Sequence, residues 1–139
     1  MNNFNSTMAL QIAEAATAFE QQRTGRAPKS VTVVLNDDTL VITLHGALSP
    51  AEQALARNPV GATQVQELHK RLFNNSAGAL RQEIKRITGV EVREAKAEVE
   101  TTTGTVVQVF TTGTVVQVFL LAGSVPADAW NRGGTGSLC

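Results

Sequence analysis

The residues best suited to bind an anion are two cations on either side of a proline. Arg26 and Lys29 flank Pro28 in a short connection that follows a predicted helix. A guanidinium and an ammonium group in such a turn can hold a phosphate, a carboxylate or an acidic patch of a partner protein. A solvated turn whose cations complement the C-terminal end of the helix dipole explains the same residues. Arg26 and Lys29 are therefore candidate residues for binding a ligand or a partner, and both interpretations stay open.

The histidines and aspartates do not form a pattern typical of a metal site or an acid–base catalyst. Zinc needs three or four close ligands, and no cluster of Cys and His supplies them, so we expect His45 and His69 to be ordinary surface residues. Asp37 and Asp38 are adjacent in a predicted hairpin turn, where their carboxylates point apart into solvent. We therefore expect no catalytic residue, no metal and no cofactor, and predict a protein that is not an enzyme.

Nucleic-acid binding is not favoured by the charge pattern. Lys70, Arg81 and Lys85 share one side of a predicted helix, but the chain has 12 basic and 12 acidic residues, a net charge of zero. No aromatic side chains alternate with these cations, so a solvated helix face explains them better. The glycine-rich residues 133–136 follow no predicted strand and precede no predicted helix, which excludes a phosphate-binding loop.

Residue usage favours a cytoplasmic protein that does not insert into the membrane. The single cysteine, Cys139, is the last residue, so no internal disulfide is expected. The first residues lack the basic start and apolar core of a secretory signal. The longest apolar stretch, residues 114–122, is shorter than the roughly 18 to 20 residues that cross a bilayer.

Apolar spacing in the first half of the chain predicts a helix, a β-hairpin and a short helix. A period of three to four residues indicates a helix over residues 8–23, which Gly25 ends. Alternating apolar residues over 31–35 and 40–44 flank the turn-forming residues 36–39, as in a hairpin. Ser49 and Glu52 have the spacing of a capping box, which predicts a helix over residues 50–57.

The second half predicts a long helix followed by a second hairpin. An amphipathic pattern runs over residues 62–88 and ends at Gly89, as one helix or as two if the weak helix formers 74–78 interrupt it. Apolar and polar residues alternate from Val90 onward, which indicates a long strand. The alternation changes phase near Glu94 and predicts a bulge there. Residues 105–110 are expected to form the next strand.

This order of elements predicts an α+β fold: helix, β-hairpin, short helix, long helix and β-hairpin, with an antiparallel sheet packed on the helices. We expect one domain over residues 1–123 and a flexible tail over residues 124–139. Apolar Val34 and Val41 point to the face of the sheet away from the helices, where another subunit could cover them.

A series of short motifs resembles one known family. The motifs are GRAPK at residues 25–29, HGALSPAE at 45–52, ITGV at 87–90, and a closing strand from Thr103-Gly104 to Val109-Phe110. In this order they resemble the MpsC-like family over about residues 8–110. The resemblance implies a small cytoplasmic protein associated with membrane ion or bicarbonate transport, and it carries over no catalytic residue. Ala27 departs from the family pattern, which has glycine at that position.

Residues 102–110 are repeated without change as residues 111–119. The second copy could form an extra antiparallel strand through a turn at residues 111–113, replace the first copy in the sheet, or remain an exposed arm. We expect an extra edge strand. Because residues 101–127 contain no charge, such an edge would be unguarded and would favour a homodimer or a higher oligomer. The predicted interface residues are Val106, Gln108, Phe110, Val115, Gln117 and Phe119.

Three functions follow from these features. The first is a non-enzymatic dimeric accessory or regulatory subunit of a membrane cation or bicarbonate transport system, with transport subunits as partners. The second is a small-ligand-binding module or small enzyme that uses Arg26 and Lys29. The third is a structural protein that self-assembles through the repeated strand.

Overall fold

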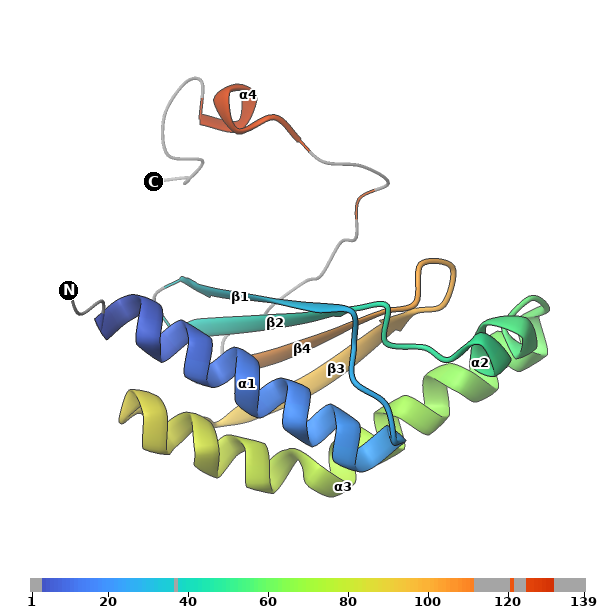
Figure 1. The fold of residues 1–139 in the computed structure, drawn as a ribbon, viewed down its shortest axis with the longest axis horizontal. Helices are drawn as coiled ribbons and strands as arrows, with labels where there is room; N and C mark the ends of the chain where they lie inside the picture. The colour runs from blue at the N-terminus through green and yellow to red at the C-terminus, as the bar shows by residue number, and fades with distance from the viewer. Residues whose placement is uncertain (1–3, 37, 112–120, 122–124, 132–139) are drawn as a thin grey trace.

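The computed structural model describes residues 4–36, 38–111, 121 and 125–131 of the chain. Four antiparallel strands form one sheet, and helices α1 (Phe4–Thr24) and α3 (Pro59–Thr88) pack against one of its faces, as Figure 1 shows. We call this the helix face and the opposite one the outer face. The predicted α+β class and the packing of the sheet on the helices are confirmed.

Helix α1 extends the predicted helix by a few residues at its start. Ile12 and Ala16 lie one turn apart on the buried side, with exposed fractions of 4% and 0%. The helix ends as predicted at Gly25, whose φ of 82° is left-handed and whose N–H donates to the carbonyl of Gln21 at 2.8 Å.

The first hairpin is confirmed, with strands β1 (Ser30–Asn36) and β2 (Thr39–His45). The strands pair antiparallel, with Val33 opposite Ile42. In β2 the apolar residues that point to the helix face are buried and the alternate residues are half-buried. This alternation follows from the two-residue period of a strand with one face on the core.

Helix α2 (Pro50–Leu55) begins with the predicted capping box. The Ser49 hydroxyl accepts from the Glu52 N–H at 3.1 Å, and the Glu52 carboxylate accepts from the Ser49 N–H at 2.8 Å. Two N–H groups that the helix leaves without partners are thereby satisfied.

Helix α3 is a single helix that continues through residues 74–78, so the interruption considered from the sequence does not occur. It also starts earlier than residue 62. Asn58 and Pro59, which end the preceding segment, also begin α3, because the Asn58 side chain accepts from the Gly61 N–H at 2.8 Å and Pro59 occupies the first helical turn. Gly89, with φ of 78°, ends it as predicted.

Strand β3 (Glu94–Glu100) is shorter than predicted, because residues 90–93 are not part of the strand. The expected long strand from Val90 with a bulge near Glu94 is therefore wrong. The change of apolar phase at Glu94 marks the point where the strand begins. Arg93 makes the first backbone contact with the sheet, by donating its N–H to the carbonyl of Thr111 at 2.9 Å.

Strand β4 (Thr105–Thr111) contains the first copy of the repeat and lies inside the sheet. The strand order is β1-β2-β4-β3, and β4 pairs antiparallel with β2 on one side and β3 on the other. A hairpin between the two copies therefore finds no free edge on β4. The predicted extra edge strand is not confirmed, since residues 112–119 lie outside the described part of the chain.

The core lies between the helix face of the sheet and the two long helices. Its largest fully buried apolar side chains are Ile42, Leu44, Leu48, Phe73, Leu80 and Phe110. Phe73 of α3 and Phe110 of β4 meet here, with ring centroids 6.0 Å apart. Within the predicted tail, the structure describes a short helix α4 (Ala127–Asn131), of which residues 127–129 are exposed.

Candidate functional site

The connection between α1 and β1 places the two predicted binding residues next to the end of β2. The Lys29 N–H donates to the carbonyl of His45 at 2.8 Å. The aliphatic part of Lys29 lies against Gly46, since a Cβ on this glycine would be 2.7 Å from the Lys29 side chain. Gly46, with φ of 61°, thus allows a left-handed turn and a close contact that another residue would obstruct. The fold brings the GRAPK and HGALSPAE motifs together.

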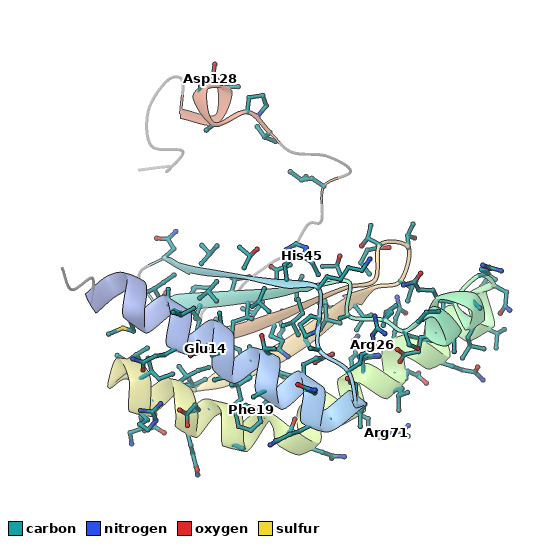
Figure 2. The ribbon with its side chains drawn as sticks, viewed as in Figure 1. Glu14, Phe19, Arg26, His45, Arg71 and Asp128 are labelled. Carbon is teal, nitrogen blue, oxygen red and sulfur yellow. The ribbon has the colours of Figure 1, made fainter. Side chains whose placement is uncertain are left out.

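Arg26 and Lys29 differ in their surroundings. Lys29 is exposed, whereas Arg26 is half-buried and its Nε has no hydrogen-bond partner among the described residues. Thr24 fixes the backbone here, because its hydroxyl accepts from the Arg26 N–H at 3.3 Å. Figure 2 shows Arg26 at the connection that follows α1 and His45 among the strands. One cation is thus available to solvent, and the other is held against the fold.

A pocket on the outer face lies beside this connection. It has a volume of about 770 Å³ and is lined mainly by polar residues. The lining residues are Thr43, His45, Gly46, Glu100, Thr102, Thr103, Thr105 and Leu121. His45 Nε2 lies 3.1 Å from the Thr32 hydroxyl, and the Glu100 carboxylate accepts from the Thr102 N–H at 2.7 Å. Hydroxyl groups and one imidazole of the pocket offer hydrogen bonds to a polar ligand. The aliphatic part of Lys29 lies against Gly46, which also lines the pocket.

His69 is not a surface residue, which corrects the prediction from the sequence. It is 4% exposed, and its Nε2 lies 2.7 Å from Glu52 Oε2. An ionised carboxylate only accepts, so Nε2 carries the proton and donates it. The capping carboxylate of α2 is in this way bonded to α3. The lining residues of the two described pockets include neither His69 nor Glu52, and the pair joins α2 to α3.

The Glu52 carboxyl has a pKa below its ordinary value of 4.5. Burial alone raises this pKa, but it is outweighed by hydrogen bonds from the Ser49 N–H and hydroxyl and by the bond and charge of His69. The carboxylate is therefore the form that the fold stabilises.

A second buried polar group joins α1 to α3. The Glu20 carboxylate, 1% exposed, pairs with the Arg23 guanidinium one turn later. Arg23 also reaches the Ser76 hydroxyl at 3.4 Å and lies 5.7 Å from the centre of the Phe73 ring. A buried ion pair of this kind is strongly destabilised when one partner is removed, because the other charge stays in the core. The sequence pattern missed this pair, although Glu20 occupies the buried period of Ile12, Ala16 and Phe19.

Gln108 is a buried polar side chain with no partner among the described residues. It points to the helix face from the middle of β4, is 0% exposed, and neither its amide nitrogen nor its amide oxygen makes a hydrogen bond. Its neighbours across the strands are Ile42 of β2 and Ala97 of β3. A buried amide without a partner keeps its full desolvation cost, so we expect an apolar side chain at this position to raise stability.

The predicted interface residues are not placed to contact another chain where the structure describes them. Val106, Gln108 and Phe110 are all buried, and Val106 and Phe110 are part of the core under the helices. The prediction treated the first copy as close to a sheet edge, but β4 is an interior strand. Val115, Gln117 and Phe119 lie outside the described residues.

Three further residues considered in the sequence, Lys70, Lys85 and Asp38, have an ion-pair or hydrogen-bond partner within the fold. Lys70 lies 3.8 Å from Glu98 and Lys85 lies 2.9 Å from Glu91, so two of the three predicted helix cations face carboxylates. Asp38 accepts from the Thr39 hydroxyl at 3.2 Å in the hairpin turn, while Asp37 lies outside the described residues. Within the described part of the chain, no group of three or more His, Cys, Asp or Glu is placed to hold a metal.

A smaller pocket, of about 190 Å³, opens at the C-terminal end of α3. It is mainly apolar, with Leu40, Ile84 and Phe110 in its floor, and Asp38 and Glu91 also line it.

None of the described helices is both long and apolar enough to cross a membrane.

Comparison with known proteins gives a family over most of the chain. The model of the MpsC family, described as the Na⁺-translocating membrane potential-generating system (MpsC), matches residues 5–114. The chain is also similar to the uncharacterized protein YbcI of Bacillus subtilis (strain 168), with 26% identity over 110 residues, which cover 79% of this chain and 89% of the relative. No solved structure matches significantly. The family match covers nearly all of α1, the helices α2 and α3, and all four strands of the sheet. The chain therefore belongs to the MpsC family.

Proposed function

We propose that this chain is a non-enzymatic accessory or regulatory subunit of a membrane cation or bicarbonate transport system, and that it acts as a dimer on the cytoplasmic side of the membrane. The observation that supports this proposal is the match to the MpsC family over residues 5–114, because the family description is that of a Na⁺-translocating system. A subunit of this kind would contact the membrane-embedded transport subunits through its surface.

The roles of the polar residues are consistent with this proposal. Glu52–His69 joins α2 to α3, and Arg23, which pairs with Glu20 inside α1, reaches α3 through the Ser76 hydroxyl. None of these side chains lines either described pocket. Exposed apolar residues are instead available to a protein partner, among them Leu10, Leu35, Val60 and Leu68, with exposed fractions of 58%, 65%, 69% and 43%. Apolar groups of this kind contribute binding energy when a partner removes them from water.

Chemical cross-linking in cells that naturally produce the chain tests the accessory role. We expect cross-linked complexes to contain integral membrane subunits of a cation or bicarbonate transporter, identified by mass spectrometry and absent from cells that lack the chain. The proposal is overturned if no transporter subunit is recovered from the producing cells, or if the same amount of transporter subunit is recovered from cells that lack the chain.

A ligand-binding role is the second candidate, supported by the position of Lys29 beside the polar pocket at His45 and Gly46. The Arg26 guanidinium and the Lys29 ammonium group of this connection are suited to a small anion. The double change Arg26→Ala and Lys29→Ala should then weaken binding of inorganic phosphate, the simplest anionic probe, measured by isothermal titration calorimetry. If phosphate does not bind the unchanged chain, or binds the unchanged and the doubly changed chain equally, a phosphate-binding role of Arg26 and Lys29 is excluded.

A further inference from the structure

The strand β1 is an open edge of the sheet. It pairs with β2 on one side, and no other described strand pairs with it. In Figure 1 it forms the upper edge of the sheet. Alternate backbone N–H and C=O groups of an edge strand point outward and can pair with another strand.

The two edges of the sheet differ in charge. The sequence of β1, SVTVVLN, contains no charged residue. The other edge, β3, has the sequence EAKAEVE, in which Glu94, Lys96, Glu98 and Glu100 are charged. Charged side chains are a common means by which natural sheets prevent pairing at an edge. The β3 edge is therefore protected, and the β1 edge is not.

Exposed apolar groups surround the end of β1. Val34 is 52% exposed and Leu35 is 65% exposed. Helix α1 packs on β1, and a short connection joins the end of α1 to the start of β1. Because β1 runs back along α1, the end of β1 lies beside the start of α1. The strand spans about 23 Å, which is roughly the length of α1 from Met8 to its last residue. Met8 and Leu10 therefore lie at the same end of the molecule as Val34 and Leu35. Met8 and Leu10 are 36% and 58% exposed.

We propose that two copies of this chain pair through their β1 strands, antiparallel and about a two-fold axis at Val33. The two sheets then join into one continuous sheet. Leu35 of one copy lies opposite Val31 of the other toward the helix face, and Val34 lies opposite Thr32 toward the outer face. All of these are β-branched or apolar residues, which form favourable cross-strand pairs. The proposal rests on the dimeric state proposed above for the function, and it assigns that state to a surface.

The same arrangement predicts that association stops at two copies. A two-fold interface uses the same surface on both chains, so it closes once it has formed. Further growth would require pairing through β3, where three acidic residues and the single cation Lys96 give each edge a net negative charge. Like charges in close cross-strand positions are destabilising. We therefore expect a dimer and not a filament.

Size-exclusion chromatography with light scattering on the full chain tests the proposal. The unchanged chain should have twice its single-chain mass of 14.7 kDa. Val34→Lys should raise the dissociation constant of the dimer at least about tenfold, because it places two ammonium groups in the interface. The matched control is Leu68→Lys, an equivalent change at an exposed residue of α3, which should leave the dimer intact. Circular dichroism should show the same helical signal for all three chains.

A third variant separates this interface from the repeated segment. A chain without residues 111–119 should still form the dimer if β1 is the interface. The proposal is overturned if the unchanged chain is monomeric, if Val34→Lys leaves the affinity unchanged, or if Leu68→Lys weakens it equally. Loss of the dimer only on deletion of residues 111–119 would also overturn it, and would assign the interface to the repeat.

The transport function can be tested separately in cells. Normal transport in cells that produce the monomeric Val34→Lys chain would remove the functional need for the dimer but would leave the accessory role. A β1 dimer in cells whose transport does not depend on the chain would have the opposite meaning.

Discussion

His69 Nε2 of α3 lies 2.7 Å from Glu52 Oε2 of α2, and this contact joins the HGALSPAE motif to the long helix. The same Glu52 carboxylate also caps its own helix through the Ser49 N–H. The Glu52 side chain thus fixes both the start of α2 and the contact of α2 with α3.

The acid stability of the fold should depend on Glu52. Because the folded state lowers the pKa of this carboxyl below 4.5, its ionised form stabilises the fold above that value, and this stabilisation is lost as the pH falls through the lower, folded pKa. Glu52→Gln should lower the free energy of unfolding at pH 7 by about 1 kcal/mol. Urea unfolding between pH 3 and pH 7 measures this, and the difference between the two chains should shrink toward the acid end. A difference that is independent of pH would contradict the assigned role.

The buried pair Glu20–Arg23 should be far more important for stability than an exposed pair with the same spacing. Glu20→Gln leaves the Arg23 cation in the core without a counter-charge and should lower the free energy of unfolding by about 3 kcal/mol. The control is Glu83→Gln, which breaks the exposed pair with Arg86, also three residues apart, and should leave the unfolding midpoint almost unchanged. Equal effects of the two changes would show that the Glu20 carboxylate is not buried as described.

Gln108→Leu should raise stability. The amide of Gln108 is fully buried and has no hydrogen-bond partner among the described residues, so an apolar side chain of similar size should raise the free energy of unfolding by about 1 to 3 kcal/mol. Gln108→Ala is the control, since it removes the amide but leaves a cavity and should not stabilise as much. A lower melting temperature for Gln108→Leu would indicate that the amide has a partner, such as a buried water molecule.

Two glycines of α3 should respond to alanine in opposite directions. A Cβ on Gly61 would lie 1.8 Å from the Leu55 carbonyl oxygen, so Gly61→Ala must push α2 away from α3 and destabilise the fold. A Cβ on Gly78 meets nothing within 4 Å, and Gly78→Ala should raise the free energy of unfolding by about 0.5 to 1 kcal/mol through helix propensity. Thermal unfolding of both variants measures this. Stabilisation by both changes would contradict the close approach at Gly61.

Features set by neighbouring residues could be predicted from the sequence. The first hairpin and the ends of α1 and α3 at Gly25 and Gly89 depend on local spacing and turn chemistry, and they are confirmed. The amphipathic pattern from residue 62 predicts the start of α3 three residues too late, because the asparagine cap Asn58 and the following Pro59 begin the helix before its apolar period does.

Features set by distant residues could not be predicted in this way. The place of β4 between β2 and β3 depends on strand order, which the pattern of one strand does not contain. The burial of Gln108 and His69 follows from that order and from the packing of α2 on α3. For the candidate site, the sequence selected Arg26 and Lys29, but it could not place Lys29 beside Gly46, because only the sheet brings these two segments together.

The membrane potential of living cells tests the proposed function most directly. It should be measured with a voltage-sensitive dye in cells that naturally produce the chain and in cells that lack it, after addition of sodium and, as a control, of choline. We predict a smaller sodium-dependent potential without the chain, restored when the unchanged chain is returned. An unaltered sodium-dependent potential in cells without the chain would contradict it.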